Sequence, residues 1–464
     1  MEKKVIVNCL EPIDKVGNTL FHSLAVNENW EDFQKMWCSK EFQHISDKNK
    51  QNKKGVTPLH IVALKGHVTT CELIIACKVE DKNPAANNGY TPLCFAVQKN
   101  HIKICDLLLK NVKNKLPIND QGSTPFHAAA HLGHLEICKL FFQNLAEKDK
   151  LPTNSNGLTP FHEATEKGHI EIVKLFLHNN GVIQEPSDNK GITPLHIAVI
   201  NSNLEICKLL LKQIENKEPK DDNGDTPLHF AAGVTVFNPN ICHLLLQNAR
   251  EKNPYNKKGV SALHRAAMMG FFPMFKAIAK TLKDKNPQTL NGLLVTPLHL
   301  ATEKASEDQK IKEDQNGSVE ICAYILKHIV DKNPRDFLGR TPLHIAAARG
   351  NLSLYKLFLT QERNPEAYDG ITPLHMAAKF GHFLVFEWIF HKIKNQDKKN
   401  PECKLRMTPL HFAAQIGSVG IVRLILESKD VVDKNPENLD GKTPLDFADG
   451  HRTILTLFQQ FARK

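Results

Sequence analysis

Apolar residues along this chain recur at helical spacing in short, paired segments. In the first helix of such a pair, Leu59 and Ala63 are four residues apart and share one face. In the second helix, apolar residues recur at i, i+3 and i+4, as Ile104, Leu107 and Leu108 do. A helix pair this small cannot bury both of its apolar faces by itself. We therefore expect successive pairs to stack on one another.

The boundaries of the first helix are set by residues with specific conformational roles. Gly55 supplies a turn, Thr57 is a natural N-cap, and Pro58 follows at the first helical position, where its missing N–H costs nothing. His60 occupies the third helical position and can reach back to the Thr, as a Glu or Gln does in a capping box. Gly66 suits a left-handed C-terminal cap.

The tetrapeptide Thr-Pro-Leu-His repeats this helix start about every 34 residues, a period typical of stacked repeat proteins. Intact copies begin at Thr57, Thr193, Thr226, Thr296, Thr341, Thr372 and Thr408. Near-copies begin at Thr19, Thr91, Thr124, Thr159, Ser261 and Thr443. A polar connection containing Pro and Gly precedes each of the later copies and predicts an extended, hairpin-like loop.

This pattern resembles the ankyrin repeat: Gly-x-Thr-Pro-Leu-His-x-Ala-Ala, then Gly-His, then a Leu-rich second helix and an Asp-x-Asn hairpin. The resemblance covers residues 17–460 in about 13 copies. It implies an all-α fold, a solenoid of stacked antiparallel helix pairs with protruding hairpin loops. We expect a degenerate N-terminal capping repeat in residues 1–50, a repeat array in residues 51–442, and a C-terminal capping repeat in residues 443–464.

Two insertions between helices interrupt the register of the repeats. One lies near residues 234–239. The longer one falls within residues 305–315 and has mixed charge. We interpret the longer insertion as a solvated loop, with a docking loop as the alternative.

Composition argues against catalysis and against a metal or cofactor. The net charge of +10 is mild for 464 residues, and no apolar run is long enough to span a membrane. Sixteen of the 23 histidines fall in two repeat slots, and none has zinc-ligand spacing. Cys71, Cys105, Cys138 and Cys207 share one repeat slot with Val173 and are expected to be buried packing groups. We expect no enzyme activity and no cofactor.

The chain is accordingly interpreted as a protein-interaction scaffold or adaptor, possibly a regulatory subunit, that binds a protein partner on the concave surface of the solenoid. The same array could also be one portion of a larger signalling, channel or enzyme protein. An alternative of another class is a binder of nucleic acid or acidic surfaces through the basic clusters Lys48–Lys54 and Lys257–Lys258. The low aromatic content of 7% disfavours that alternative. We expect a monomer without membrane insertion, in the cytoplasm or also the nucleus.

The ankyrin resemblance implies that ligands meet the hairpin tips and the exposed face of the first helix. On that face, the slots seven and eight residues after each Thr give two sets of candidates. Apolar candidates are Ile200, Val234, Met268, Met269 and Phe380, and basic candidates are Lys65, Lys99, Lys167, Lys304 and Arg349. For the apolar set, local packing against the hairpins is the competing interpretation.

The resemblance also implies a modification site, because hairpin asparagines of ankyrin repeats are substrates of an asparaginyl hydroxylase in animals. The matching slot, eight residues before the motif Thr or Ser, holds Asn83, Asn253, Asn333, Asn364, Asn400 and Asn435.

Overall fold

The computed structural model describes residues 11–39, 48–77, 81–179, 185–233, 238–305, 317–359, 363–393 and 399–462. Within these residues every regular element is a helix, and the one isolated β-bridge joins Tyr255 to Ser261. The predicted all-α, paired-helix fold is confirmed. The chain divides into two compact units, Met1–Asp222 and Asn223–Lys464.

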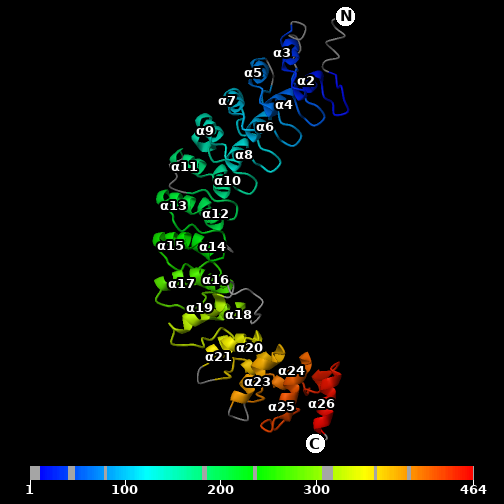
Figure 1. The fold of residues 1–464 in the computed structure, drawn as a ribbon, viewed down its shortest axis with the longest axis vertical. Coiled ribbons are helices and arrows are strands. Elements are labelled where there is room, and N and C mark those ends of the chain that lie inside the picture. The colour runs from blue at the N-terminus through cyan, green and yellow to red at the C-terminus, as the bar shows by residue number, and fades with distance from the viewer. Residues whose placement is uncertain are drawn as a thin grey trace. The chain divides into compact units, whose positions relative to one another are not determined.

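The N-terminal unit consists of helix pairs arranged as two rows of helices, as Figure 1 shows. The first helices of its pairs are α2 (Leu20–Val26), α4 (Pro58–Lys65), α6 (Pro92–Gln98), α8 (Pro125–Leu132), α10 (Pro160–Lys167) and α12 (Pro194–Ile200). The second helices are α3 (Trp30–Cys38), α5 (Val68–Ala76), α7 (Ile102–Asn111), α9 (Leu135–Asn144), α11 (Ile170–Asn179) and α13 (Leu204–Gln213). A short 3-10 helix, η2 (Glu147–Asp149), follows α9.

The C-terminal unit repeats this arrangement. Its first helices are α14 (Pro227–Gly233), α16 (Ala262–Met269), α18 (Pro297–Lys304), α20 (Pro342–Ala348), α22 (Pro373–Lys379) and α24 (Pro409–Ile416). Its second helices are α15 (Pro239–Asn248), α17 (Phe272–Thr281), α19 (Gly317–Leu326), α21 (Leu352–Leu357), α23 (Phe383–Lys392) and α25 (Val419–Glu427). The 3-10 helix η5 (Asp446–Ala448) and α26 (Arg452–Ala462) end the unit.

Most first helices begin as the motif predicts, with a capping box between the motif Thr or Ser and the motif His; α6, which has Cys94 in place of the His, lacks it. At α4, the Thr57 hydroxyl accepts from the His60 amide, and the His60 ring accepts in turn from the Thr57 amide at 3.0 Å. Pro58 at the first position has no N–H, and the Leu59 amide donates to Oδ1 of Asn49 at 3.1 Å. Gly66 ends the helix at φ 82°, in the left-handed region that Gly adopts without strain.

The motif histidines also join neighbouring repeats, which the sequence reasoning did not foresee. In α22, Nδ1 of His375 accepts from the Thr372 amide at 3.1 Å, while Nε2 donates to the Met407 carbonyl of the next repeat at 3.1 Å. This pair of bonds fixes the neutral Nε2–H tautomer. Burial lowers the pKa of His375 to about 4, which agrees with a neutral ring. The second histidine slot reaches the other way, since Nε2 of His382 lies 2.9 Å from the Ala348 carbonyl of the preceding repeat.

The core lies between the two rows of helices and between successive repeats. The predicted cysteine packing slot is confirmed, because Cys71, Cys105, Cys138 and Cys207 are all fully buried. Burial raises the pKa of each of these thiols to about 12, so they are unreactive packing groups.

The first helix pair, α2 and α3, and the last helix, α26, both bury aromatic side chains. Phe21, Phe33 and Trp37 of α2 and α3 form a cluster with ring centroids 5.0–5.3 Å apart. At the other end, α26 buries Ile454 and Phe458 and leaves Gln459 exposed.

Candidate partner-binding site

The predicted apolar contacts on the first-helix face are exposed or half-buried where the structure describes them. Ile200, at the end of α12 in the N-terminal unit, is 40% exposed. In the C-terminal unit, Met268 is 44% exposed, Met269 is half-buried, and Phe380 is 50% exposed. Val234 lies outside the described residues, as do residues 306–315 of the predicted insertion.

The predicted basic residues are exposed as well, but several are already paired with carboxylates. Nζ of Lys65 lies 2.7 Å from Glu28, and Nζ of Lys167 lies 2.7 Å from the adjacent Glu166. Lys99 and Lys304 are exposed at the ends of their helices. Pairing weakens the positive potential that these residues offer to an acidic partner.

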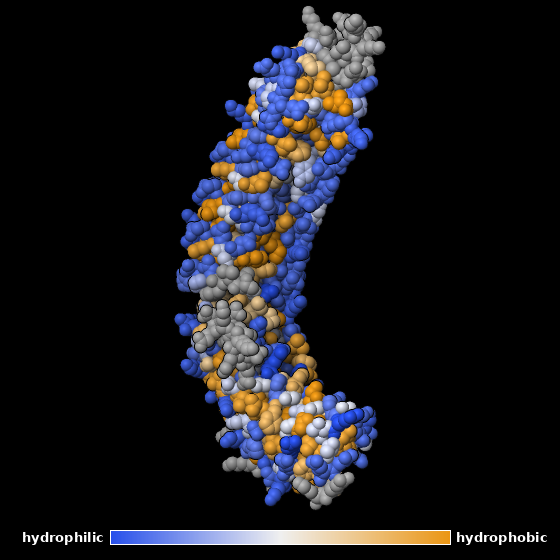
Figure 2. Space-filling model, turned by 45° about the vertical axis from the view of Figure 1, so that its right-hand side comes forward, coloured by the Kyte–Doolittle hydropathy of each residue, from blue (hydrophilic) through white to orange (hydrophobic). Residues whose placement is uncertain are grey.

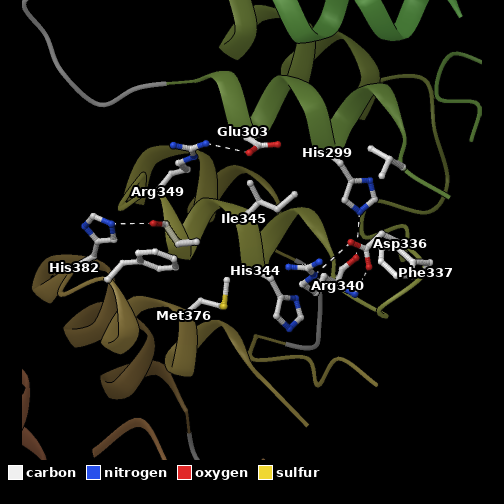
Figure 3. Close-up of a pocket in the computed structure, with 13 residues that line it drawn as sticks. His299, Glu303, Asp336, Phe337, Arg340, His344, Ile345, Arg349, Met376 and His382 are labelled. Atoms are coloured by element: carbon white, nitrogen blue, oxygen red, sulfur yellow. Dashed lines mark hydrogen bonds and ion pairs between the residues drawn. The ribbon is translucent and has the colours of Figure 1, made fainter. Parts of the chain in front are cut away.

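Two of the predicted residues, Arg349 and Phe380, come together in a pocket of about 760 Å³ on the first-helix face of the C-terminal unit. The floor of this pocket comes from α18, α20 and α22, and one wall comes from the hairpin between α19 and α20 (Figure 3). The lining residues are Val295, His299, Glu303, Asp336, Phe337, Arg340, His344, Ile345, Ala348, Arg349, Met376, Phe380 and His382.

The pocket has an apolar centre between two arginine–carboxylate pairs. On one side, Arg349 donates to Oε1 of Glu303 at 3.0 Å. On the hairpin side, Nε of Arg340 lies 3.4 Å from Oδ2 of Asp336. Figure 3 shows Ile345 pointing into the space between these two pairs.

The hairpin carboxylate is held in place by its own turn. Oδ1 of Asp336 accepts from the amides of Leu338 at 2.9 Å and Arg340 at 2.8 Å. The buried Nε of Arg340 has no hydrogen bond of good geometry. Because that nitrogen is buried against Asp336, a ligand can meet Arg340 only through the rest of its side chain, which is 36% exposed.

The histidines of the pocket are structural. His299 donates to the Arg340 carbonyl at 3.2 Å and His344 donates to the Ile371 carbonyl at 3.0 Å. Burial lowers the pKa of His299, and that of His344 to about 4. Both rings are therefore neutral and engaged at neutral pH, and neither is available as a general base. What the pocket can do chemically is hold an apolar side chain beside a hydrogen-bond acceptor.

Sequence reasoning missed Ile345 and Met376, which occupy the slot four residues after the motif Thr. That slot faces the pocket because it lies one helical turn before the slots seven and eight residues after the motif Thr, which hold the predicted contacts. The sequence shows only that both residues in this slot are large and apolar; that the slot is half-buried in α20 and α22 is known from the structure.

Five of the six asparagines expected as modification sites share a structural role in the described hairpins, whereas the Asn333 side chain donates to the Phe358 carbonyl instead. Oδ1 of Asn83, Asn253 and Asn364 accepts the amide of the motif Leu ten residues later, at 3.0–3.1 Å. Asn400 and Asn435 make the same bond at 3.3 and 3.4 Å. In one repeat the slot holds Glu185, whose Oε1 accepts from the Leu195 amide at 3.0 Å.

A lysine slot that the sequence reasoning also missed explains part of the basic composition. The residue before the hairpin asparagine is Lys in most repeats, and its Nζ reaches carbonyls at the ends of second helices. Lys252 donates to the Leu246 and Ala249 carbonyls, and Lys434 donates to the Leu426 carbonyl. Lys48, in the first proposed basic cluster, is buried and donates to the Trp37 carbonyl at 2.7 Å. These cations stabilise negative helix ends.

Two further features bear on the class of site. Among the described residues, no group of three or more His, Cys, Asp or Glu side chains is placed to hold a metal ion. Nor do those residues include a helix long and apolar enough to cross a membrane.

Comparison with known proteins agrees with this architecture. The family model described as "Ankyrin repeats (3 copies)" matches residues 22–120, 110–186, 177–255 and 311–402. The model described as "Ankyrin repeat" matches residues 406–437. No curated protein matches the chain.

Two solved structures are similar to about half of the chain. The human ASB11 ankyrin repeat domain is 26% identical with a TM-score of 0.40, and the match covers 49% of this chain and 98% of that domain. The ankyrin repeat domain of Bcl-3, described as a unique member of the IkappaB protein family, is 22% identical with a TM-score of 0.43, covering 48% and 99%. The family models match more than half of the chain, and the chain therefore belongs to the ankyrin-repeat family.

Proposed function

We propose that this chain is a non-enzymatic scaffold that binds a protein partner through the pocket lined by Arg349 and Phe380. Ankyrin repeats are generic protein-interaction modules and are typically not catalytic, which supports binding as the general function. The observation that carries the specific site is the exposed apolar centre flanked by two arginines.

The partner that fits this pocket presents a large apolar side chain next to a carboxylate or carbonyl oxygen. The apolar side chain would contact Ile345, Met376 and Phe380, which are half-buried or exposed in the free protein. The oxygen would accept a hydrogen bond from Arg340, or it would replace the Glu303 carboxylate as the partner of Arg349. Because these side chains stand on packed helices and a hydrogen-bonded turn, little ordering is needed on binding.

A charge substitution at the pocket tests this proposal. We expect Phe380→Glu to weaken capture of the partner from native cell lysate at least tenfold, since the variant places a carboxylate in the apolar centre. Leu384→Glu is the matched control, because Leu384 is 64% exposed on α23 and does not line the pocket. Equal loss of capture in both variants, or in neither, would refute the proposed site.

We also propose Met268 and Met269 as part of the partner surface, since methionine is polarisable and suits adaptable contacts. The double variant Met268→Glu with Met269→Lys should keep its helical spectrum and melting temperature and bind the partner at least tenfold more weakly. A variant that unfolds would instead show that these side chains are core.

For the hydroxylation sites, we propose that Asn83, Asn253, Asn333, Asn364, Asn400 and Asn435 are substrates of an asparaginyl hydroxylase. Mass spectrometry after incubation with such an enzyme should show addition of one oxygen to at least one of these peptides. Unmodified peptides at every site would refute this proposal.

A further inference from the structure

The hairpin that leads into α18 is two residues longer than an ordinary hairpin of the array. In the hairpin before α4, the Asn52 amide donates to the carbonyl of Val56, four residues later. In the hairpin before α18, the Thr289 amide donates to the carbonyl of Val295, six residues later, at 2.9 Å. This bond encloses residues 290–294, all of which are exposed. The long hairpin therefore projects an extended tip into solvent.

Exposed leucines lie on this tip, but they do not by themselves indicate a function. Leu290 is 69% exposed and Leu293 is 43% exposed. Figure 2 shows apolar areas among polar ones on one face of the molecule, and exposed apolar side chains are common on protein surfaces. The unusual feature of the tip is the Asn-Gly pair between these leucines, Asn291 and Gly292.

An Asn-Gly pair can rearrange without an enzyme, because glycine has no side chain to hinder attack by its own nitrogen on the asparagine side chain. The chain contains six such pairs, of which those at Asn180 and Asn316 lie outside the described residues. The other four asparagines are all exposed: Asn88, Asn156, Asn223 and Asn291. Exposure of the asparagine therefore does not distinguish these four pairs.

The space around the glycine does distinguish them. A carbon added at Gly89, Gly157 or Gly224 would lie 2.4–2.9 Å from an atom of the following hairpin. A carbon added at Gly292 would meet no atom within 4 Å. The following hairpin thus packs against the glycine in three of the pairs and leaves room for rearrangement at the fourth.

The backbone amide of Gly292 is also free to react. The Gly89 amide donates to the Ala86 carbonyl and the Gly157 amide donates to the Asn154 carbonyl, both at 2.9 Å. Within the part of the chain that the structure describes, the Gly292 amide donates no hydrogen bond. It can therefore lose its proton to base without breaking a turn, and the nitrogen can then act as a nucleophile.

The asparagine side chain is held by a donor that would assist this attack. Oδ1 of Asn291 accepts from the Leu293 amide at 3.1 Å. Attack on Cγ places negative charge on this oxygen, and a fixed hydrogen-bond donor stabilises that charge. Oδ1 of Asn88 accepts a similar bond from the Tyr90 amide at 3.2 Å, so the free and uncrowded Gly292 amide is what sets Asn291 apart.

We propose that Asn291 is a site of non-enzymatic deamidation. The Gly292 nitrogen attacks Cγ of Asn291, and a bond forms between them as the bond from Cγ to Nδ2 breaks. Nδ2 leaves as ammonia with the proton from the Gly292 amide, which leaves a succinimide ring. Water then adds to one of the two ring carbonyls and opens the ring to aspartate or isoaspartate. Water and base are the only other reactants.

The modified residue would lie close to the wall of the pocket. The Leu293 carbonyl accepts from the Phe337 amide at 3.1 Å, and both Phe337 and Val295 line the pocket. Deamidation adds a carboxylate to the hairpin beside this wall, and isoaspartate also adds one carbon to its backbone. The proposal does not depend on the partner-binding function, because it concerns the chemistry of the hairpin alone.

Peptide mapping of the full chain tests this inference. The folded protein is incubated at neutral pH, and mass spectrometry follows the gain of one mass unit in each Asn-Gly peptide. We expect Asn291 to convert at least tenfold faster than Asn88, Asn156 or Asn223. In concentrated urea the four rates should become similar, because unfolding removes the differences in crowding and hydrogen bonding.

A shortened hairpin tests the structural cause. Deletion of Leu293 and Leu294 places Gly292 two residues before the motif Thr, as Gly89 and Gly157 are, and should slow conversion of Asn291 at least tenfold. Leu294→Gly is the control, because it keeps the hairpin length and suits the left-handed φ of 52° at this position. The control should convert at least as fast as the wild type. Circular dichroism melting checks that both variants fold; if the deletion variant does not, the comparison of folded and urea-unfolded wild type decides.

Both aspartate and isoaspartate should form at position 291. Aspartate alone would show direct hydrolysis of the side-chain amide by water and would overturn attack by Gly292. Equal rates for the four pairs in the folded chain would also overturn the proposal. So would fast conversion of Asn291 in a folded deletion variant, or a tenfold difference that persists in urea, because the hairpin structure would then not be the cause.

Discussion

At the scale of single residues, the motif histidines join one repeat to the next, and the hairpin asparagines join each hairpin to the start of the helix that follows. The motif His closes its own helix start with Nδ1 and donates from Nε2 to the following repeat, as His375 does. The hairpin asparagine accepts from the amide that follows the helix proline, as Asn364 does for Leu374. These polar bonds add to the apolar core that lies between the two rows of helices.

Removing one of these histidines should therefore cost stability. We expect His375→Ala to lower the free energy of unfolding by about 2 kcal/mol, because it leaves the buried Thr372 amide and Met407 carbonyl without partners. Urea denaturation measures this change. His178→Ala, at an exposed position of α11, should change it by at most a few tenths of a kcal/mol.

The buried carboxyl group of Glu185 should make stability fall as pH rises. Burial raises the pKa of this carboxyl group to about 8, and Oε2 is buried without a hydrogen bond. The unfolded chain has the lower pKa, so it releases the proton first as pH rises, and the folded state loses stability between about pH 4.5 and 8.

Glu185→Gln removes that penalty while keeping an acceptor for the Leu195 amide. We expect the variant to be more stable than the wild type at pH 8, and its advantage to shrink as pH falls toward 5. Thermal melting at both pH values measures this; an advantage that grows toward pH 5 would contradict the assigned burial of the carboxyl group.

At the scale of elements, the sequence predicted helix pairs and their caps because local chemistry determines them. Thr57, Pro58 and Gly66 have the conformations expected of their positions. What could not be predicted is which exposed slots share a pocket, because that depends on how far neighbouring helices and hairpins approach one another. Arg349 and Phe380 were identified because the ankyrin resemblance assigns their slot, eight residues after the motif Thr, to the ligand-binding face, whereas the slot of Ile345 and Met376 was not selected and is half-buried in the stacked helices.

The asparagine slot gives a prediction at this scale, since it fixes a hairpin to a helix start. Asn253→Ala should destabilise the C-terminal unit by about 1 kcal/mol, the usual cost of losing a helix cap. Asn253→Asp keeps the acceptor and should cost less above the carboxyl pKa. Urea midpoints at neutral pH measure both, and a larger loss for Asp than for Ala would contradict the capping role.

At the scale of the whole molecule, the repeated histidines should make stability depend on pH. Burial lowers the pKa of His60, His162, His264, His344 and His375 to about 4, from the usual histidine pKa of 6.5. Below pH 6.5 the unfolded chain binds protons that the folded rings do not accept, so stability falls steadily toward pH 4. Urea midpoints should drop over this range, and a flat profile would contradict the buried, neutral rings.

The central claim for the whole molecule is that a protein partner occupies the pocket of the C-terminal unit. Photo-crosslinking in native cell extract tests it directly, with benzoylphenylalanine placed at Phe380 in one variant and at Leu384 in the other. The two positions are 50% and 64% exposed, and Phe380 alone lines the pocket. The account predicts a discrete crosslinked protein from position 380 that is absent from position 384. The same products from both positions, or a discrete product from position 384 alone, would contradict it.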